Sequence, residues 1–581
     1  MKFKITCFCL LTLFSITTCS CVSTKKESTG AYTRTIQQLS SSIKKQMHKH
    51  KIQGLSIALV DDEKLVWAEG FGYADVANKA PATVDTIYKV ASITKLFTAT
   101  SIMQLAEAGK IVIDQPLTTY LSGFSIKSRF PHSPITPRNV MSHHSGLPSD
   151  LFSFIFNDNP PRFTKAKDAL KNEYLAFPPN YIFSYSNIGY FLLGHLIEKV
   201  TGEDYTQFVQ RNILYPLAME SSSFQPTTER LAKCYRGGKP MKESSHNPLP
   251  AGGLYSTVRD LSRLISMVFA HGTLDGQRIL APDTLAEMLT PQNEHVPLDL
   301  DIKIGLGWFL GGQDLHYAGK TLAHGGSINS YHSQLTILPN HKLGVVVLSN
   351  SHEAAGIVEE IATEALRLAL EEKTGIRPPP ARRTKTIKLS QRQLEQEQGY
   401  YASSAGLLSF KAGRGGLFTS LGGTPLKLVP LSDNSFIAKY SLWGLFTFSL
   451  PQLSKLKFSF CDIGSKRVLI LENKGERMVF GEKVQPQPIG EVWEKRKGKY
   501  QVLDKEGSNW LRDVALTVED GFLTLSGEIE GIGQLKAALL PFADTAMIMG
   551  LGRNTGDTVR FETIAGQEIM FYSGYRFRKK E

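Results

Sequence analysis

The spacing of apolar residues changes several times along the first two thirds of the chain. Helix spacing predicts a helix over residues 30–50. Two short apolar runs at 55–60 and 65–70, on either side of an acidic turn, predict a β-hairpin. A strongly apolar helix is then predicted to begin near Ser92 and to stop at Gly109. A helix and a strand pair are therefore predicted before the chain passes into helices.

A mostly helical middle follows, and strands return near residue 330. Apolar spacing predicts helices over 188–201 and 258–271, then strands over 332–338 and 343–350, and a closing helix over 356–372. Strands at both ends with helices between them fit one mixed domain whose sheet joins the early and late parts of the chain. The expected fold class is α+β, an antiparallel sheet flanked by helices with a largely helical subdomain.

After a predicted linker, the sequence pattern changes from mixed helices and strands to short strands alone. Residues 375–390 contain three consecutive prolines and several basic residues, which is a linker composition. Beyond them, short strand-like runs alternate with Gly, Asn and Asp turns, and a weak repeat relates the segments around Gly399 and Gly498. We expect all-β modules, each a barrel or sandwich, over 391–485 and 486–581, with one larger β domain as the alternative.

The first residues are typical of an export signal. An apolar stretch over residues 5–16 follows two lysines and is too short to span a bilayer comfortably. Cys19 and Cys21 come next, and the pattern resembles a bacterial lipoprotein signal over residues 1–21, with a plain secretory signal as the alternative. We expect an exported protein in the periplasm or at the cell surface, joined to a bacterial membrane through a lipidated cysteine and a tether over residues 22–35.

Composition narrows the classes of partner and cofactor. The 581 residues suggest two or three domains, and the net charge is +12. The basic residues are scattered instead of gathered on a recognisable nucleic-acid module, so we expect no nucleic-acid partner. Four of the six cysteines lie in the signal region, and Cys234 and Cys461 fall in different predicted domains. We therefore expect neither a structural disulfide nor a metal site, and no cofactor.

The candidate chemistry begins at Ser92. In an S-x-x-K pattern, Ser92 and Lys95 lie on one face of the helix start, where a lysine of lowered pKa can take the serine proton. The helix N-terminus also favours a developing oxyanion. The motif alone is weak evidence, because the chain repeats it at four other places: Ser23/Lys26, Ser41/Lys44, Ser42/Lys45 and Ser454/Lys457.

A second motif is Y-x-N, formed by Tyr185 and Asn187. A phenol beside a lysine can relay a proton between a nucleophile and a leaving group. An asparagine carboxamide offers a donor and an acceptor to a substrate amide. The structural alternative is a loop tyrosine that packs on the following helix.

A third motif precedes the late strand pair and contains His324, Gly325, Gly326 and Ser327. Glycines here let a ligand approach the backbone closely. The N–H of Ser327 could join that of Ser92 in an oxyanion hole, where each donor is commonly worth about 3–4 kcal/mol. The structural alternative is a Gly-rich turn with a surface histidine.

The three motifs in this order resemble the serine β-lactamase and penicillin-binding-protein superfamily. The tyrosine form of the second motif looks like class C β-lactamases, D-alanyl-D-alanine carboxypeptidases and related esterases. The similarity extends over roughly residues 35–372 and includes further stretches: His144-Ser145-Gly146-Leu147-Pro148, Ala251-Gly252-Gly253-Leu254, Gly305-Leu306-Gly307-Trp308 and Val345-Val346-Val347-Leu348-Ser349-Asn350. Residues 36–374 are then expected to form the hydrolase domain, and the β modules resemble lipocalin-like appendages more loosely.

The resemblance implies a serine hydrolase that works through an acyl-enzyme. It assigns the roles residue by residue: nucleophile Ser92, proton-transfer groups Lys95 and Tyr185, substrate-binding residues Asn187, His324, Gly325 and Gly326, and backbone oxyanion donors Ser92 and Ser327. Penicillin-active members commonly have a lysine where this chain has His324, so a D-amino-acid peptidase or an esterase is favoured over a β-lactamase. The substrate would be a small molecule or a peptide, with peptidoglycan fragments as one source.

Two other hypotheses stay open at this point. One is a non-catalytic sensor that keeps the fold and recognises wall peptides or β-lactams. The other is a surface lipoprotein in which the β modules do the main work by attaching the chain to the cell wall or to a partner. Retention of Ser92, Lys95 and Tyr185 favours catalysis, because a pure binding protein does not need all three.

Overall fold

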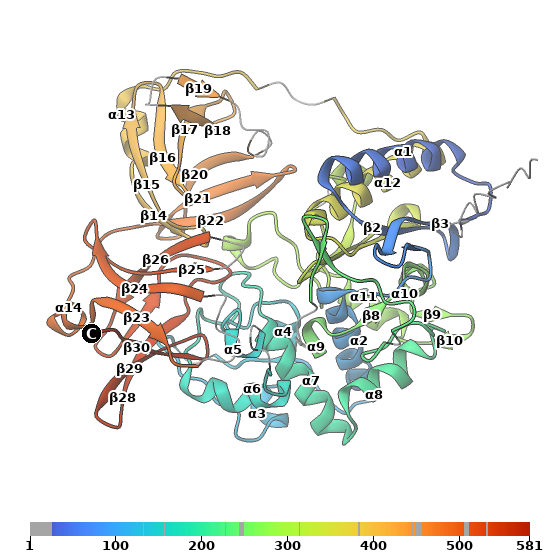
Figure 1. The fold of residues 1–581 in the computed structure, drawn as a ribbon, viewed down its shortest axis with the longest axis horizontal. Helices are drawn as coiled ribbons and strands as arrows, with labels where there is room; N and C mark the ends of the chain where they lie inside the picture. The colour runs from blue at the N-terminus through green and yellow to red at the C-terminus, as the bar shows by residue number, and fades with distance from the viewer. Residues whose placement is uncertain are drawn as a thin grey trace, which may run out of the picture.

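The computed structural model describes residues 26–581 except 132, 156, 158, 227, 243–248, 313, 381–383, 443–445, 449–452, 454–455, 505–510 and 530–532. The expected signal and its candidate lipidation sites, Cys19 and Cys21, lie outside the described residues. The chain forms a mixed α/β unit followed by two β-barrels (Figure 1). In the described part, none of the helices has the length and apolarity needed to cross a bilayer.

The sheet of the first unit joins the two ends of that unit. Its strands run in the order β1-β3-β2-β13-β12-β11, and β2 pairs antiparallel with β13 with Ala58 opposite Val346. The mixed domain expected from the sequence is therefore confirmed. The strands are β1 (Glu27–Ser28), β2 (Gly54–Asp61), β3 (Lys64–Asp75), β11 (Leu322–Ile328), β12 (Tyr331–Leu338) and β13 (Leu343–Ser349), with β4 (Ala80–Pro81) paired to β3.

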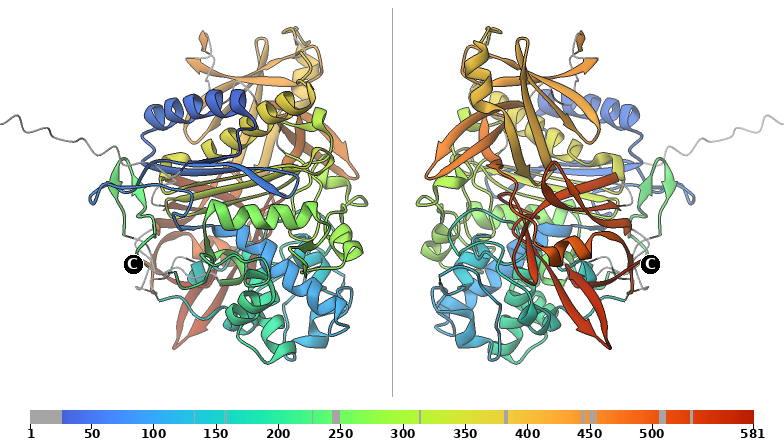
Figure 2. Two further views of the ribbon diagram at one scale, coloured as in Figure 1. Left: turned by 90° about the vertical axis from the view of Figure 1, so that its right-hand side faces the viewer. Right: turned by 90° about the vertical axis from the view of Figure 1, so that its left-hand side faces the viewer.

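Both faces of this sheet are covered by helices (Figures 1 and 2). Leu55, Ile57 and Leu59 of β2 face α1 (Thr33–His50) and α12 (Ile357–Thr374) within one apolar cluster. The alternate residues, such as Ala58 and Val60, belong to a second cluster on the side of the helical subdomain. Alternation of side chains along a strand explains why nearly every residue of β2 is buried.

The predicted tether over residues 22–35 is described from residue 26 onwards, and this part contacts the first unit. Glu27–Ser28 pairs with β3, and Glu27 accepts two hydrogen bonds from Arg259, at 2.7 and 2.8 Å. Helix α1 then begins at Thr33. A short strand pairing was invisible in a Ser-, Thr- and Lys-rich stretch because its stabilisation comes from backbone hydrogen bonds to a distant strand.

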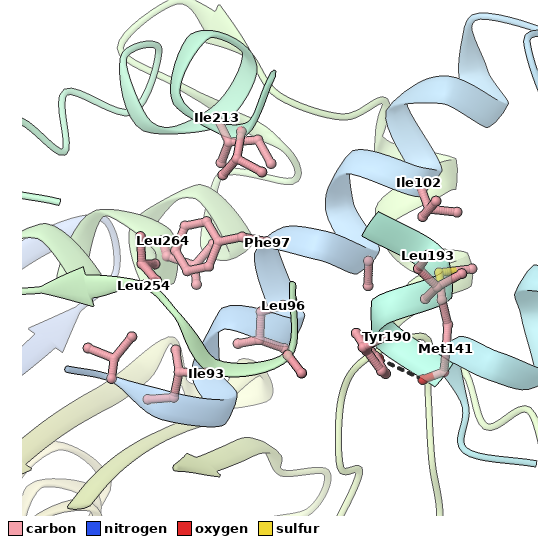
Figure 3. Packing of buried hydrophobic residues seen from close by; sticks show 14 of the residues in the cluster. Ile93, Leu96, Phe97, Ile102, Met141, Tyr190, Leu193, Ile213, Leu254 and Leu264 are labelled. Atoms are coloured by element: carbon pink, nitrogen blue, oxygen red, sulfur yellow. Dashed lines mark hydrogen bonds between the residues drawn. The ribbon is translucent and has the colours of Figure 1, made fainter. Parts of the chain in front are cut away.

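Helix α2 (Thr94–Glu107) lies at the centre of the helical subdomain. Leu96, Phe97 and Ile102 pack among side chains from the surrounding helices (Figure 3), which is expected for a helix that is apolar on all sides. The other helices are α3 (Leu117–Tyr120), α4 (Pro137–Met141), α5 (Phe152–Ile155), α6 (Ala166–Ala169), α7 (Asn187–Thr201), α8 (Tyr205–Val209), α9 (Leu249–Gly252), α10 (Val258–Phe269) and α11 (Pro282–Met288).

Short strand pairs connect these helices: β5 (Tyr88–Lys89) with β8 (Tyr255–Ser256), β6 (Tyr235–Arg236) with β7 (Lys239–Pro240), and β9 (Thr273–Leu274) with β10 (Gln277–Arg278). The pairing of β5 with β8 matters most for the site, because it fixes the chain just before Ser92.

The C-terminal region consists of two closed barrels, as the barrel form of the prediction expected. In the first, pairing of β17 with β18 closes a ring that β19 extends. Its strands are β14 (Gly399–Ser403), β15 (Gly406–Gly413), β16 (Gly416–Leu421), β17 (Thr424–Pro430), β18 (Phe436–Leu442), β19 (Phe446–Phe448), β20 (Lys457–Ile463), β21 (Lys466–Asn473) and β22 (Glu476–Val484).

The second barrel closes through β30 on β23. A short helix precedes each barrel, α13 (Gln391–Glu397) and α14 (Glu491–Arg496), so the sequence repeat corresponds to a repeated structural unit. The strands are β23 (Gly498–Val502), β24 (Leu511–Glu519), β25 (Phe522–Ile529), β26 (Gly533–Pro541), β27 (Thr545–Ile548), β28 (Thr558–Ile564), β29 (Gln567–Tyr572) and β30 (Tyr575–Lys579).

Both barrels contact the first unit at one apolar cluster. Phe177 and Leu298 of the first unit pack with Val468 and Ile470 of β21 and with Leu551, which follows β27. The three parts of the chain therefore meet around the loop that leads to Tyr185.

Candidate active site

The turn before Ser92 is held in a conformation that most residues avoid. Ala91 has a φ of 48°, in the left-handed region that costs a non-glycine residue about 1–2 kcal/mol. The Thr94 hydroxyl donates to the Ala91 carbonyl at 2.6 Å and accepts from the Leu254 N–H at 3.1 Å. The Val90 N–H donates to the Leu254 carbonyl at 2.9 Å. Strain supported in this way is common where a reactive side chain must be presented.

Lys95 lies one helical turn after Ser92 and is fully buried. Its Nζ lies 2.7 Å from the Asn187 Oδ1, 2.7 Å from the Ala251 carbonyl oxygen and 3.3 Å from the Ser92 Oγ. Burial, and then the nearby Arg553 charge, hold the pKa of Lys95 well below its usual value. A neutral amine donates two hydrogen bonds, here to Asn187 and Ala251, and its lone pair then accepts from the Ser92 hydroxyl.

Tyr185 is the second group on Ser92. Its hydroxyl hydrogen-bonds with the Ser92 hydroxyl, and burial raises the pKa of Tyr185 to about 12. The tyrosine is therefore a protonated phenol at neutral pH. The Lys95 Nζ also lies over the Tyr185 ring, 4.9 Å from its centroid, where an ammonium ion is stabilised. The structure thus brings the predicted nucleophile Ser92 together with both predicted proton-transfer residues, Lys95 and Tyr185.

His143 positions Tyr185 and was not predicted as a site residue. Its ring stacks on the Tyr185 ring with centroids 4.1 Å apart, and its Nδ1 accepts the Ser186 N–H at 3.1 Å. Burial lowers the pKa of His143 well below its usual value, so the ring is uncharged. The signal in the sequence was its place directly before the stretch that begins at His144.

Asn187 has partners other than the expected substrate amide. Its Oδ1 accepts from Lys95, and its Nδ2 donates to the Asp150 Oδ1 at 2.7 Å. One N–H of the carboxamide is left for a substrate. Asn187 therefore orients Lys95 first, and Asp150 joins the site as a residue that the sequence did not reveal.

Strand β11 carries the third motif past Ser92 at the edge of the sheet. At Gly326, an added Cβ would overlap the Val90 carbonyl oxygen, so glycine is required where the strand passes the nucleophile turn. Ser327 pairs with His332, one pair away from the two-residue turn closed by Ile328 and Tyr331. Antiparallel pairs alternate between bonded and non-bonded, so the Ser327 N–H points to the outer edge of β11, as the oxyanion assignment requires.

His324 is uncharged. Burial, and then the Lys95 charge, lower the pKa of His324 to about 3. Its Nδ1–H donates to the Gly325 carbonyl at 2.7 Å, and its ring meets the Phe309 ring edge-on at a centroid distance of 5.4 Å. The residue lines the cavity but brings no positive charge to it.

Arg553 enters the site from the second barrel and was not predicted. Its guanidinium donates to the Asp150 Oδ2 at 3.1 Å and lies 4.9 Å from the Tyr185 ring centroid. A polar chain therefore runs from Ser92 through Lys95, Asn187 and Asp150 to Arg553. The signal in the sequence was the glycine-rich run over residues 550–556, which interrupts the strand pattern of the repeat.

A cavity of about 560 Å³ adjoins these groups, a size typical of small-ligand pockets. His324 and Gly325 line one part of it, Arg553 another, and Ser404 and Glu476 of the first barrel a third. All three parts of the chain therefore shape the space in front of the β11 strand.

Comparisons with known proteins agree with this geometry. The Beta-lactamase family matches residues 39–370. Protein flp of Staphylococcus aureus (strain MW2) is 27% identical over 346 residues, which cover 56% of this chain and 66% of that protein, just under two thirds of its length. Penicillin-binding protein 4* of Bacillus subtilis (strain 168) is 26% identical over 327 residues, 52% of this chain and 69% of that protein.

Among solved structures, the octameric penicillin-binding protein homologue from Pyrococcus abyssi is similar with a TM-score of 0.52 and 26% identity. The similarity covers 76% of this chain and 99% of that one, so it extends beyond the first unit. The family match spans more than half of the chain and contains the three motifs in order. The chain therefore belongs to the Beta-lactamase family.

Proposed function

We propose that this protein is an exported serine hydrolase that forms an acyl-enzyme on Ser92. The observation that carries the proposal is the position of the Lys95 Nζ, 3.3 Å from the Ser92 Oγ and 2.7 Å from each of two acceptors, the Asn187 Oδ1 and the Ala251 carbonyl oxygen. In the neutral amine these acceptors take the two N–H groups, which leaves the lone pair for the Ser92 proton. A buried lysine of lowered pKa in this geometry is a general base for the serine. The resemblance of the three motifs to those of the family supports the same role for Lys95.

During acylation, Lys95 and Tyr185 would pass a proton from Ser92 to the leaving group. Lys95 accepts the Ser92 proton as Oγ attacks the substrate carbonyl, and the ammonium that forms lies over the Tyr185 and Tyr190 rings. The N–H groups of Ser92 and Ser327 stabilise the oxyanion. Tyr185, protonated at neutral pH, donates a proton to the leaving group and is reprotonated from Lys95. Water then attacks the acyl-enzyme by the reverse route.

The substrate class follows from charge. The uncharged His324 lacks the cation that commonly meets the carboxylate of a penicillin, so hydrolysis of a D-amino-acid peptide or an ester is favoured over that of a β-lactam. Two relatives are named a penicillin-binding protein and a penicillin-binding protein homologue, and these names support a substrate whose carbonyl reacts with a serine as that of a penicillin does.

Labelling tests the nucleophile. Purified protein treated with a fluorophosphonate probe, and separately with a fluorescent penicillin, should be labelled by the first and weakly or not at all by the second. Ser92→Ala should abolish labelling, whereas Ser41→Ala, which alters another S-x-x-K match, should not. Labelling that persists in Ser92→Ala contradicts the assignment. A protein that reacts with neither probe supports the non-catalytic sensor.

Export and anchoring form part of the proposal and rest on residues 1–21. Growth of an expressing bacterium with a radiolabelled fatty acid should label the protein, and Cys21→Ala should remove the label while Cys19→Ala keeps it. An unlabelled protein in the extracellular or periplasmic fraction would indicate the plain secretory signal instead.

A further inference from the structure

The second barrel contributes a loop to the active site. The Asn554 N–H donates to the Ser149 Oγ at 2.9 Å, and the Ser184 hydroxyl donates to the Gly552 carbonyl at 3.5 Å. Gly556 lies against the Ala176 backbone so closely that an added Cβ would overlap it. These contacts fix the loop through its backbone on both sides of Arg553.

The Arg553 guanidinium has N–H groups that the contacts among the described residues do not use. Of its five N–H groups, the described residues account for one bond, to Asp150. The side chain is 47% exposed, and the residue lines the cavity that His324 and Gly325 also line. Its guanidinium carbon lies over the ring of Tyr185, whose hydroxyl hydrogen-bonds with Ser92. The guanidinium is therefore oriented by two contacts while one of its edges stays open to the cavity.

The other charges around the cavity do not provide the same site. Asp299 accepts from His144 and from the Phe183 N–H, Glu359 is paired with Lys474, and the Glu476 carboxylate accepts the Gly312 N–H. Lys303 lines the cavity too, but among the described residues no contact joins it to Tyr185, Ser92 or Asp150.

We propose that Arg553 of the second barrel binds a carboxylate of the substrate, which makes this barrel part of the substrate site. The inference rests on the proposed acyl transfer through Ser92 and names a recognition residue for it. This charge lies over the Tyr185 ring and not on β11, so it does not take the place of the lysine that commonly meets the carboxylate of a penicillin. A guanidinium forms two parallel hydrogen bonds to a carboxylate, so a substrate with a free carboxylate near the scissile carbonyl is preferred over its neutral amide.

Two serine-reactive probes test this without knowledge of the natural substrate. One is a fluorophosphonate whose short arm ends in a carboxylate, and the other is the same probe ending in a carboxamide. Second-order labelling rates should favour the carboxylate by about 10- to 100-fold, the usual range for a hydrogen-bonded charge pair. Arg553→Gln should reduce this ratio to about one. Arg553→Lys, which keeps the charge but not the planar fork, should give an intermediate ratio.

Lys303→Gln is the matched control, because it removes another cation of the same cavity, and it should keep the ratio of the unaltered protein. The ratio also separates binding from misfolding, since a damaged site slows both probes together. Equal rates for the two probes in the unaltered protein, or an unchanged ratio in Arg553→Gln, overturn the inference while Ser92 labelling upholds the proposed function. Absence of Ser92 labelling by both probes overturns the proposed function itself.

Discussion

The two β-barrels have the same architecture and arise from the same sequence repeat, yet they contact the catalytic unit differently. Apart from the shared apolar cluster, the first barrel forms partly exposed ion pairs with the first unit, between Arg477 and Asp301 and between Lys474 and Glu359. The second inserts the segment 549–557 between β27 and β28, and Arg553 reaches the Tyr185 ring. Figure 1 shows both barrels on the same side of the first unit.

Both barrels share the apolar cluster around Phe177 and Leu298, so the difference lies in the polar groups that each barrel brings to the first unit. Surface ion pairs are weak, typically about 0–1 kcal/mol, and they are screened by salt. The second barrel instead places Asp557 in full burial beside Asp150 and Glu173, and it adds a guanidinium to the hydrogen-bond chain that ends at Lys95. One copy of the barrel therefore limits the cavity, while the other takes part in the chemistry of the site.

The largest expected effect comes from the apolar contact of the inserted loop. Leu551→Ala leaves a cavity in the cluster shared with Phe177 and Leu298, and such a truncation costs about 2–5 kcal/mol. We expect a lower free energy of unfolding in urea and slower fluorophosphonate labelling of Ser92, because the loop carries Arg553. Val468→Ala, in the same cluster but on the first barrel, should lower stability less and leave the labelling rate unchanged. Equal rates of Ser92 labelling in the two variants would contradict the claim that only the second barrel acts on the active site.

Asp557 should make the stability of the docked second barrel depend on pH. Burial, followed by the charges of Asp150 and Glu173, raises the pKa of Asp557 to about 8. The folded protein thus holds a proton that the unfolded chain releases near pH 4, so this stabilisation is complete at low pH and is lost as pH rises to about 8. For one proton, the free energy of unfolding changes by about 1.4 kcal/mol per pH unit in this range. Asp557→Asn should flatten the decline of Tm between pH 5 and 8, and a parallel decline in both proteins would contradict the assignment.

Arg553 should also set the pH at which the site becomes active. Its charge helps to lower the pKa of Lys95, and the base is active only when neutral. Arg553→Gln should therefore move the acid limb of the labelling rate to higher pH and so lower the rate at a fixed pH on that limb. Arg477→Gln on the first barrel should not move the limb. A limb that stays in place in Arg553→Gln would mean that the guanidinium does not act on Lys95.

The smallest effect is expected at the ion pairs between the first barrel and the first unit. Removing the pairs of the first barrel with Arg477→Gln and Lys474→Gln together should lower the free energy of unfolding by about 1 kcal/mol or less. The difference should shrink further in 1 M salt, where the screening length is only about 3 Å. Urea unfolding at low and high salt measures this. A loss of several kcal/mol, or of Ser92 labelling, would show that the first barrel matters as much as the second.

Much of the fold followed from local pattern. The hairpin of β2 and β3, the helix after Ser92 and the late strands of the sheet lie where apolar spacing predicted them, because each element buries its own periodic face. The strand β1 and the boundary of α2, which begins at Thr94 after a short turn, depend on contacts with distant segments instead. Contacts with distant segments produce no periodic pattern of apolar residues, so the sequence does not predict them.

The residues of the site that belong to the three ordered motifs were predictable from the sequence. Ser92, Lys95 and Tyr185 lie together, and the glycines of β11 lie beside the nucleophile turn. The neighbours Asp150 and Arg553 were not predictable, since neither belongs to a motif and the second lies in another domain. Asn187 shows the same limit, because its partner Asp150 became visible only in three dimensions.

The central claim is that Ser92 carries the acyl group, and mass spectrometry of a modified peptide tests it most directly. Trypsin should release residues 90–95, because Lys89 precedes this segment and Lys95 ends it. After brief exposure to the carboxylate fluorophosphonate, this peptide should carry one adduct, located on Ser92 by fragmentation. An adduct on any other serine, or an unmodified peptide from a protein that has been labelled, would contradict the account.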